Sequence, residues 1–141
     1  MLLRLFAISI VALVLTSCAS APRPVAEEEE LTGVWRLIAV GAPEGLPDGS
    51  VQLLSFREDG VTVHRCPGEP LPLAFRDGRL RRDPSRGSNE LILTECPKTT
   101  WAPTYRYIDR VLYAEPELKF AGRRLIITAD TGELLVLKRH H

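Results

Sequence analysis

A serine and a histidine in one hairpin are the first residues whose types could do chemistry. Asp59-Gly60 is typical of a two-residue type I′ turn, because both central residues of that turn need a positive φ. Counting outward from this turn pairs Ser55 with His64 on one face of the sheet. A serine nucleophile also needs a third group that orients its base, and no acid falls on that face. We expect a solvated polar face, with a Ser/His hydrolase as the alternative.

A metal site is the second chemistry that the residue types allow. His64 and Cys66 are two apart on a strand and so face the same way, and with Cys96 they could form a Cys₂His site. A fourth ligand is not evident, and an oxidised cysteine pair cannot bind a metal. We therefore expect neither a metal nor a cofactor.

Arginines cluster around a second hairpin, whose turn is Asp77-Gly78. They are Arg76, Arg79, Arg81, Arg82 and Arg86. Such a patch could bind anionic lipid or an acidic envelope protein, although an edge strand also carries positive charge simply to prevent sheets from associating. Lysine plus arginine equals aspartate plus glutamate, at 18 each, so no overall field favours nucleic acid.

The N-terminal residues 1–17 read as a signal peptide. One basic residue, Arg4, precedes an apolar run from Leu5 to Leu15 that is interrupted only by Ser9. The run ends at polar residues short of the roughly 20 that a membrane-spanning helix needs. We expect this segment to be cleaved from the mature protein.

The residues up to Cys18 resemble the lipobox of bacterial lipoproteins. In Leu15-Thr16-Ser17-Cys18 a small residue precedes the cysteine, whose thiol would receive diacylglycerol. The resemblance implies a mature chain that begins at Cys18 and is anchored by lipid, since two or more acyl chains give a stable anchor. Ala19 in place of aspartate implies, by the same resemblance, the periplasmic face of the outer membrane. The alternative is an unmodified cysteine beside an ordinary cleavage site.

Lipid on Cys18 would leave Cys66 and Cys96 as an even pair in an oxidising compartment. A disulfide between them follows from that setting, with two free buried thiols as the alternative. Closing a loop of about 30 residues would stabilise the fold by about 3 to 4 kcal/mol in the chain-entropy model.

Residues 18–30 read as a disordered acidic tether. They carry Pro22 and Pro24, end in the four glutamates Glu27 to Glu30, and hold almost nothing that could enter a core. A single domain then spans 31–141, close to the membrane surface.

Short apolar runs between turn signals predict a mainly β domain, with α+β as the broader possibility. We expect an antiparallel curved sheet or partly closed small barrel of about eight strands with one helix. The expected strands are 33–40, 51–58, 61–66, 71–75, 79–82, 90–94, 118–120, 125–128 and 134–138. Pro72 should place its strand at an edge, and Trp35, Leu37 and Ala39 should share a face.

The segment 103–114 fits two patterns. Trp101, Tyr105, Ile108 and Leu112 fall at helical spacing, whereas Tyr105, Tyr107 and Val111 also fit a strand. Pro103 suits the first turn of a helix, and Pro116 would follow its end, so we favour the helix.

The chain from Leu31 to Arg139 resembles the META domain family, which includes HslJ-like envelope lipoproteins. The motifs are Leu31-Thr32-Gly33-Val34-Trp35-Arg36-Leu37, a strand that ends in a cysteine, Thr94-Glu95-Cys96, Gly122-Arg123-Arg124-Leu125 and Gly132-Glu133-Leu134. The chain departs from the family at Arg65-Cys66-Pro67, where Gly-Cys-Asn is usual. The resemblance implies a mostly antiparallel sheet with a helix, in a small protein of the cell envelope.

These observations favour a non-enzymatic envelope lipoprotein that acts by binding or by supporting the envelope under stress. The alternative is a lipocalin-like carrier of a small apolar ligand. A carrier requires an apolar cavity of about 300 Å³ or more, whereas a scaffold requires a packed interior.

Overall fold

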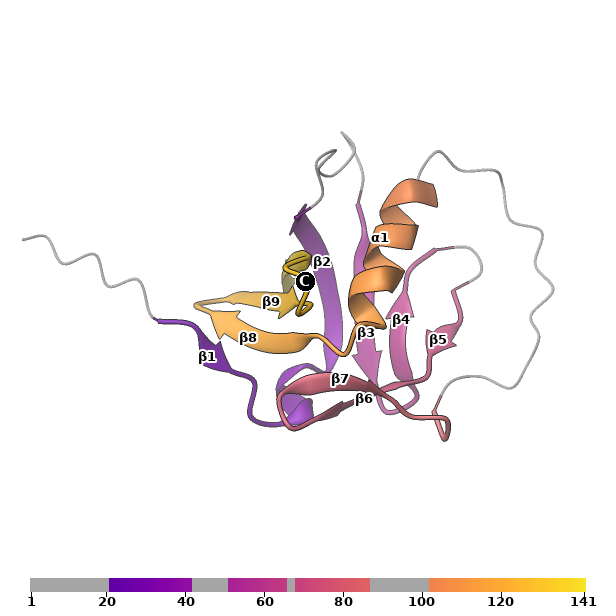
Figure 1. The fold of residues 1–141 in the computed structure, drawn as a ribbon, viewed down its shortest axis with the longest axis horizontal. Coiled ribbons are helices and arrows are strands. Elements are labelled where there is room, and N and C mark those ends of the chain that lie inside the picture. Colours follow the sequence, from indigo (N-terminus) through magenta and orange to yellow (C-terminus); the bar gives the residue numbers. More distant parts are fainter. Residues whose placement is uncertain (1–20, 42–50, 66–67, 87–101) are drawn as a thin grey trace, which may run out of the picture.

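The computed structural model describes residues 21–41, 51–65, 68–86 and 102–141 (Figure 1). Within them it has one α-helix, α1 (Ala102–Leu112), and one short 3₁₀ helix, η1 (Glu28–Glu30). The strands are β1 (Arg23–Pro24), β2 (Gly33–Val40), β3 (Leu53–Arg57), β4 (Gly60–Val63), β5 (Pro70–Leu71), β6 (Leu73–Arg76), β7 (Arg79–Arg82), β8 (Glu117–Ala121), β9 (Arg124–Thr128) and β10 (Leu134–Arg139). No helix in these ranges combines the length and apolar character needed to cross a bilayer.

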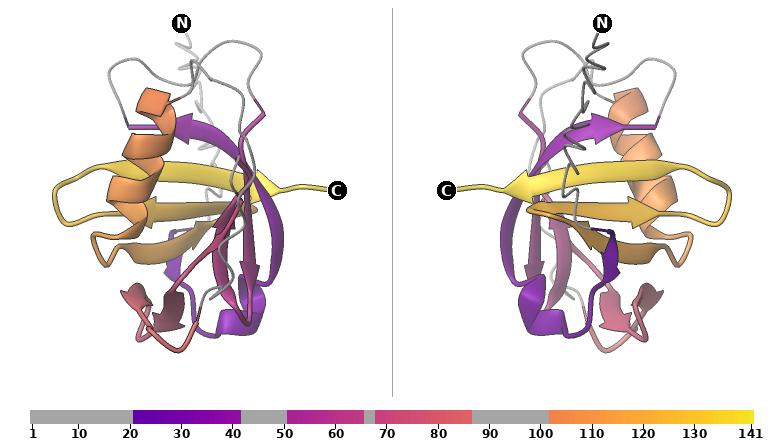
Figure 2. Two further views of the ribbon diagram at one scale, coloured as in Figure 1. Left: turned by 90° about the vertical axis from the view of Figure 1, so that its right-hand side faces the viewer. Right: turned by 90° about the vertical axis from the view of Figure 1, so that its left-hand side faces the viewer.

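The strands form one antiparallel sheet that is nearly closed into a small barrel (Figure 2). Their order is β5-β4-β3-β2-β10-β9-β8-β7-β6, and β1 pairs with β8. The two ends of this order, β5 and β6, are consecutive in the chain and are separated by Pro72. Proline has no N–H to donate to a ladder, so it suits the point where the chain leaves one edge for the other. The predicted fold class and the edge position beside Pro72 are confirmed.

The two Asp-Gly hairpins have different turns. At the second, Asp77 (φ 52°) and Gly78 (φ 76°) both have positive φ and join Arg76 to Arg79, as a type I′ turn requires. At the first, Arg57 pairs with Gly60, so the turn residues are Glu58 and Asp59, and the type I′ turn predicted at Asp59-Gly60 is wrong.

Gly60 is needed for closure of the sheet rather than for the turn. Its φ is +129°, and a Cβ there would lie 2.1 Å from the carbonyl oxygen of Leu71 in β5. Only glycine tolerates both that φ and that approach of two strands. The predicted pairing is therefore displaced by two residues, and Ser55 lies opposite Thr62 instead of His64.

Strands β2, β8, β9 and β10 lie where their alternation predicts them. Ala39 departs from the pattern. Val136 of β10 pairs with Ala39 and Leu137 pairs with Leu37, so Ile38 is an extra residue in β2. A bulge of this kind turns the following side chains to the other face. Trp35 and Leu37 are buried as expected, but Ala39 is exposed. The strand expected at 90–94 lies outside the described residues.

The predicted helix is confirmed as α1, which lies across the open side of the curved sheet (Figures 1 and 2). Ile108, Val111 and Leu112 are fully buried on one side of it, at helical spacing. The helix stops before Glu115, whose φ of 51° is left-handed, and Pro116 follows. Trp101 lies outside the described residues.

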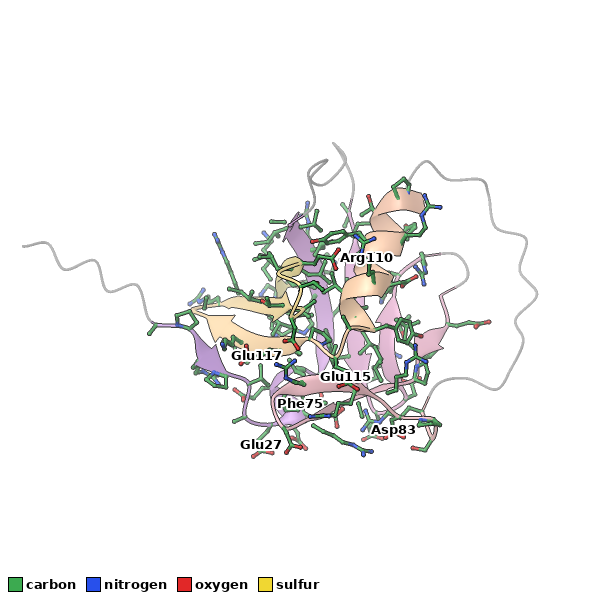
Figure 3. All side chains as sticks on the ribbon, in the orientation of Figure 1. Glu27, Phe75, Asp83, Arg110, Glu115 and Glu117 are labelled. Atoms are coloured by element: carbon green, nitrogen blue, oxygen red, sulfur yellow. The ribbon has the colours of Figure 1, made fainter. Side chains whose placement is uncertain are left out.

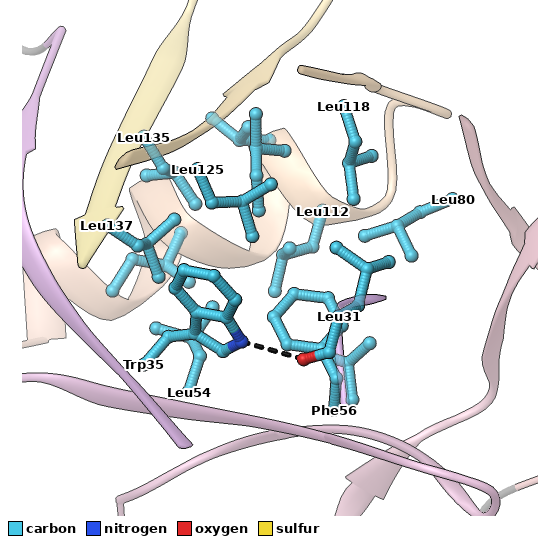
Figure 4. Packing of buried hydrophobic residues seen from close by; sticks show 14 of the residues in the cluster. Leu31, Trp35, Leu54, Phe56, Leu80, Leu112, Leu118, Leu125, Leu135 and Leu137 are labelled. Carbon is cyan, nitrogen blue, oxygen red and sulfur yellow. Dashed lines mark hydrogen bonds between the residues drawn. The ribbon is translucent and has the colours of Figure 1, made fainter. Parts of the chain in front are cut away.

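The core fills the space between the helix and the sheet (Figure 4). Trp35 is 1% exposed, and its indole Nε1–H donates to the carbonyl oxygen of Leu31 at 2.7 Å. Leu31 itself is fully buried. Burying the indole with its N–H satisfied secures the entry of the chain into β2.

The N-terminal segment is part of the fold from Arg23 onward, so the disordered tether expected over residues 18–30 is wrong for residues 23–30. Arg23 pairs with Phe120 of β8, and Val25 is 3% exposed and donates its N–H to Leu118 O at 3.1 Å. Two glutamates of the acidic run bind arginines: Glu30 binds Arg23 and Glu28 binds Arg86. The prediction failed because the partners of this segment are remote in the chain and its composition does not reveal them.

Candidate functional site

Ser55 and His64 lie together despite the changed register. A displacement of two residues keeps both side chains on the predicted face, and the Ser55 Oγ and His64 Nε2 atoms are 2.5 Å apart in a hydrogen bond. Ser55 is 1% exposed, whereas His64 is exposed and lines a shallow hollow with Thr62, Arg65 and Gly68. A buried hydroxyl cannot reach a substrate, and the described residues place no carboxylate in hydrogen-bond contact with the imidazole. The geometry suits a hydroxyl that the histidine satisfies better than it suits a nucleophile.

The predicted cysteine chemistry lies outside the described residues, which include none of Cys18, Cys66 and Cys96. The lipid anchor and the disulfide therefore stay predictions. Within the described ranges no three His, Cys, Asp or Glu side chains gather as metal ligands.

Next to the position of Cys66, Arg65 fastens the end of β4 to the helix. Its Nη1 lies 2.8 Å from Asp109 Oδ2, and its guanidinium carbon lies 5.5 Å from the centre of the Tyr105 ring. The carboxylate and the ring hold Arg65 in place, so it is a structural residue.

The arginines of the second hairpin are largely neutralised by acids. Four lie within salt-bridge distance of a carboxylate: Arg76 of Asp83 (2.6 Å), Arg79 of Asp130 (3.1 Å), Arg81 of Glu115 (3.7 Å) and Arg86 of Glu28 (2.7 Å). Arg82 lies over the Tyr113 ring, 4.9 Å from its centre. Figure 3 shows Asp83 and Glu115 beside this hairpin. Because the charges cancel locally, the predicted patch offers little net positive potential to an anionic partner.

A bidentate ion pair joins this hairpin to the N-terminal segment. Arg86 binds both carboxylate oxygens of Glu28, at 2.7 and 3.1 Å, and the backbone N–H of Phe75 also donates to Glu28. The Arg86 hydrogen bond is the main reason why the pKa of Glu28 is lowered and that of Arg86 raised. This pair links residues 58 positions apart.

A second basic region, which we name the basic hollow, lies where β1, the turn between β8 and β9, and the end of β10 meet. It has a volume of about 690 Å³. Glu30 is the acidic side chain among its lining residues, and its basic and aromatic lining consists of Arg23, Trp35, Phe120, Arg123, Lys138, Arg139 and His141. No sequence motif indicates it, because its residues come from four separated segments.

Two arginines of the basic hollow lie over aromatic rings. The guanidinium carbon of Arg139 is 4.1 Å from the centre of the Trp35 ring, and that of Arg23 is 4.7 Å from the Phe120 ring. Cation–π contacts of this kind hold a guanidinium without cancelling its charge. Arg139 also donates to the carbonyl oxygens of Thr32 and Glu30, at 2.5 and 2.6 Å, which clamps the end of η1 to β10.

Glu30 is the counter-ion of Arg23 in the basic hollow. Arg23 Nη2 donates to Glu30 Oε2 at 2.6 Å, and the backbone N–H of Ala26 donates to Glu30 Oε1 at 2.9 Å. These bonds, the one from Arg23 first, lower the pKa of Glu30 from 4.5 to about 2. The lining therefore keeps an excess of positive charge, carried by Arg123, Lys138 and Arg139.

The interior of the barrel is packed. The inward-facing positions of β2, β8, β9 and β10 hold fully or almost fully buried large apolar side chains, and α1 adds three more. A pocket beside η1 has a volume of about 100 Å³ and is lined in part by charged residues such as Glu28 and Arg57. That is well below the roughly 300 Å³ that a carrier of a small ligand needs.

Comparison with known proteins adds no relative, since no family model, curated protein or solved structure matches this chain. The resemblance to the META family therefore rests on the motifs of the sequence.

Proposed function

We propose that this chain is a non-enzymatic lipoprotein of the bacterial cell envelope, anchored by lipid on Cys18, with a META-type domain that acts as a binding scaffold at the membrane surface. The signal-peptide pattern and the lipobox support the anchor. The motifs from Leu31 to Leu134 and a mainly antiparallel sheet with one helix agree with the family resemblance.

The observation that carries the proposal is the docking of β1 on β8. Because Arg23 is paired with Phe120, only the residues between Cys18 and Arg23 are left to connect an anchor to the domain. Five steps of extended chain span at most roughly 18 Å. A lipid on Cys18 would therefore hold the β1 side of the barrel against the membrane, whereas a tether that reached Glu30 would leave the domain free to rotate.

The interior and the Ser55–His64 pair favour a scaffold over the alternatives. A carrier needs an internal apolar cavity, and the barrel is filled by its own side chains. A hydrolase needs an accessible nucleophile, and Ser55 is buried.

Mass spectrometry of the protein isolated from membranes tests the anchor. We expect an N-terminal peptide that begins at a diacylated Cys18, and accumulation of the uncleaved precursor when globomycin blocks lipoprotein processing. A Cys18→Ala variant should be lost from the membrane fraction. An unmodified N-terminus, or a Cys18→Ala variant that stays in the membrane, contradicts the proposal.

Crosslinking in intact cells tests the scaffold role. A short-range crosslinker should capture the same envelope partner in wild type and in Ser55→Ala. A flexible insertion after Ala19 should reduce capture, because it would move the domain away from the surface. Equal capture by the lengthened chain would show that close positioning does not matter.

A further inference from the structure

We propose that the basic hollow binds the phosphate group of an anionic membrane lipid. This inference rests on the proposed anchor, since Cys18 would bring the hollow to the membrane. The second hairpin, in contrast, has four of its five arginines paired with acids and serves as an internal comparison.

The charge of the basic hollow favours an anion. Four arginine and lysine side chains line it together with His141, against the Glu30 carboxylate, which is already bound to Arg23. Arg123 and Lys138 are exposed, and neither forms an ion pair with another described residue. Phosphate oxygens accept hydrogen bonds from both guanidinium and ammonium groups, and the planar guanidinium matches two oxygens at once.

The aromatic rings preorganise the site. Arg139 is held between the Trp35 ring and two backbone carbonyls, and Arg23 is held between the Phe120 ring and Glu30. Little side-chain entropy is then lost at these two arginines when an anion binds. The exposed pair, Arg123 and Lys138, remains available to close on the ligand.

The position of the basic hollow favours a lipid over a free anion. Arg23 forms one wall and is also the first residue of β1, so an anchor on Cys18 would lie on the same side of the barrel as the hollow. Figure 1 shows β1 beside the turn that joins β8 to β9. A lipid anchor at most roughly 18 Å from this wall would give headgroups a high effective concentration there. The hollow, of about 690 Å³, has room for a phosphate and its glycerol.

Vesicle flotation of the mature chain with Cys18→Ser tests binding without the anchor. We expect it to bind vesicles of phosphatidylcholine and phosphatidylglycerol in equal parts, and not vesicles of phosphatidylcholine alone. Each basic residue near an anionic surface contributes about fivefold to binding. Arg123→Glu with Lys138→Glu should therefore weaken binding at least tenfold, with unchanged circular dichroism.

The matched control is Arg76→Glu with Arg81→Glu, two exposed arginines that are each paired with an acid, which changes the net charge by the same amount on the second hairpin. This variant should bind almost as well as the parent. Equal losses in the two double variants would mean that only net charge matters and would overturn the proposal. If Arg123→Glu with Lys138→Glu unfolds the chain, Arg123→Gln with Lys138→Gln is used, with a smaller loss expected.

Two further experiments distinguish a lipid phosphate from free phosphate, and failure of the proposed anchor from failure of the proposed site. Inorganic phosphate should compete only weakly, and full competition at low concentration would identify free phosphate as the ligand and overturn the lipid assignment. For the lipidated protein isolated from membranes, acetylation of Lys138 should be slower in vesicles that contain phosphatidylglycerol than in vesicles of phosphatidylcholine alone. An unmodified Cys18 with intact flotation would reject the proposed anchor alone, whereas a lipidated Cys18 without composition dependence would reject the hollow alone.

Discussion

Two arginine-rich regions of the described structure, the second hairpin and the basic hollow, differ in what holds the guanidinium groups. At the second hairpin the partners are mostly carboxylates, as in Arg86 with Glu28. In the basic hollow, Arg139 is held by backbone carbonyls and the Trp35 ring. A carboxylate cancels the charge of an arginine, whereas carbonyls and rings fix its position and leave the charge. Clustering of arginines along the sequence is therefore a poor guide to where the surface is positive.

The largest effect on stability is expected for Arg139→Ala. The variant loses two hydrogen bonds to backbone carbonyls and the contact with Trp35, so the free energy of unfolding should fall by about 2 kcal/mol. Arg139→Lys should recover little of this stability, because an ammonium group cannot reproduce the two hydrogen bonds that the planar guanidinium donates to the two carbonyl oxygens. Urea denaturation measures both.

Arg123→Ala is the control for this prediction within the same hollow. Its side chain is exposed, and its removal should change the free energy of unfolding by less than about 0.5 kcal/mol. Equal losses of unfolding free energy for Arg139→Ala and Arg123→Ala would contradict the view that Arg139 holds η1 to β10 whereas Arg123 does not contribute to stability.

Arg86→Ala tests the hairpin side of the comparison. The variant leaves the half-buried Glu28 without the guanidinium that binds both of its oxygens, and after allowance for solvent screening we expect a loss of about 1 to 2 kcal/mol. Arg81→Ala removes a longer, more exposed pair at 3.7 Å and should cost less than about 0.5 kcal/mol. If both variants are neutral in denaturation experiments, the hairpin arginines are not structural.

The smallest effect is expected at Glu30, and it depends on pH. Its pKa in the fold is about 2, below the ordinary 4.5, so the ionised form contributes stability that is fully present above pH 4.5 and is lost as the pH falls toward 2. Wild type should therefore be more stable than Glu30→Gln near neutral pH, and the difference should shrink between pH 4.5 and 2 and vanish below pH 2. Denaturation curves over this range measure it, with Glu29→Gln as the control. A difference that persists at the acid end would mean that the carboxylate charge is not the cause.

Local patterns in the sequence were sufficient for most elements of the fold. Alternation of apolar residues predicted β2, β8, β9 and β10, and helical spacing predicted α1. Both patterns depend only on residues that are a few positions apart in the sequence. The docked segment from Arg23 to Glu30 could not be predicted in this way. Its composition is that of a linker, and its stabilising partners, such as Arg86 and Arg139, lie far along the chain.

The candidate site was only partly accessible from sequence. Ser55 and His64 were placed on one face because side chains alternate along a strand, and that parity survived the change of register. The basic hollow was not predicted, since Arg23, Arg123 and Lys138 meet only through the pairing of β1, β8, β9 and β10.

The two Asp-Gly dipeptides separate what the local sequence determines from what the tertiary structure decides. At Asp77-Gly78 the local preference for positive φ was enough, and the sequence by itself determined the turn. At Asp59-Gly60 the turn lies one position earlier than the same dipeptide predicts, at Glu58-Asp59. Gly60 is needed instead in β4, where that strand approaches Leu71 as the sheet closes. The sequence determined the strands, the helix and their buried faces through short-range periodicity. The register at closure, the docking of the N-terminal segment and the choice of which arginines keep their charge were decided only by the tertiary structure, because each depends on contacts between residues that are distant in the chain.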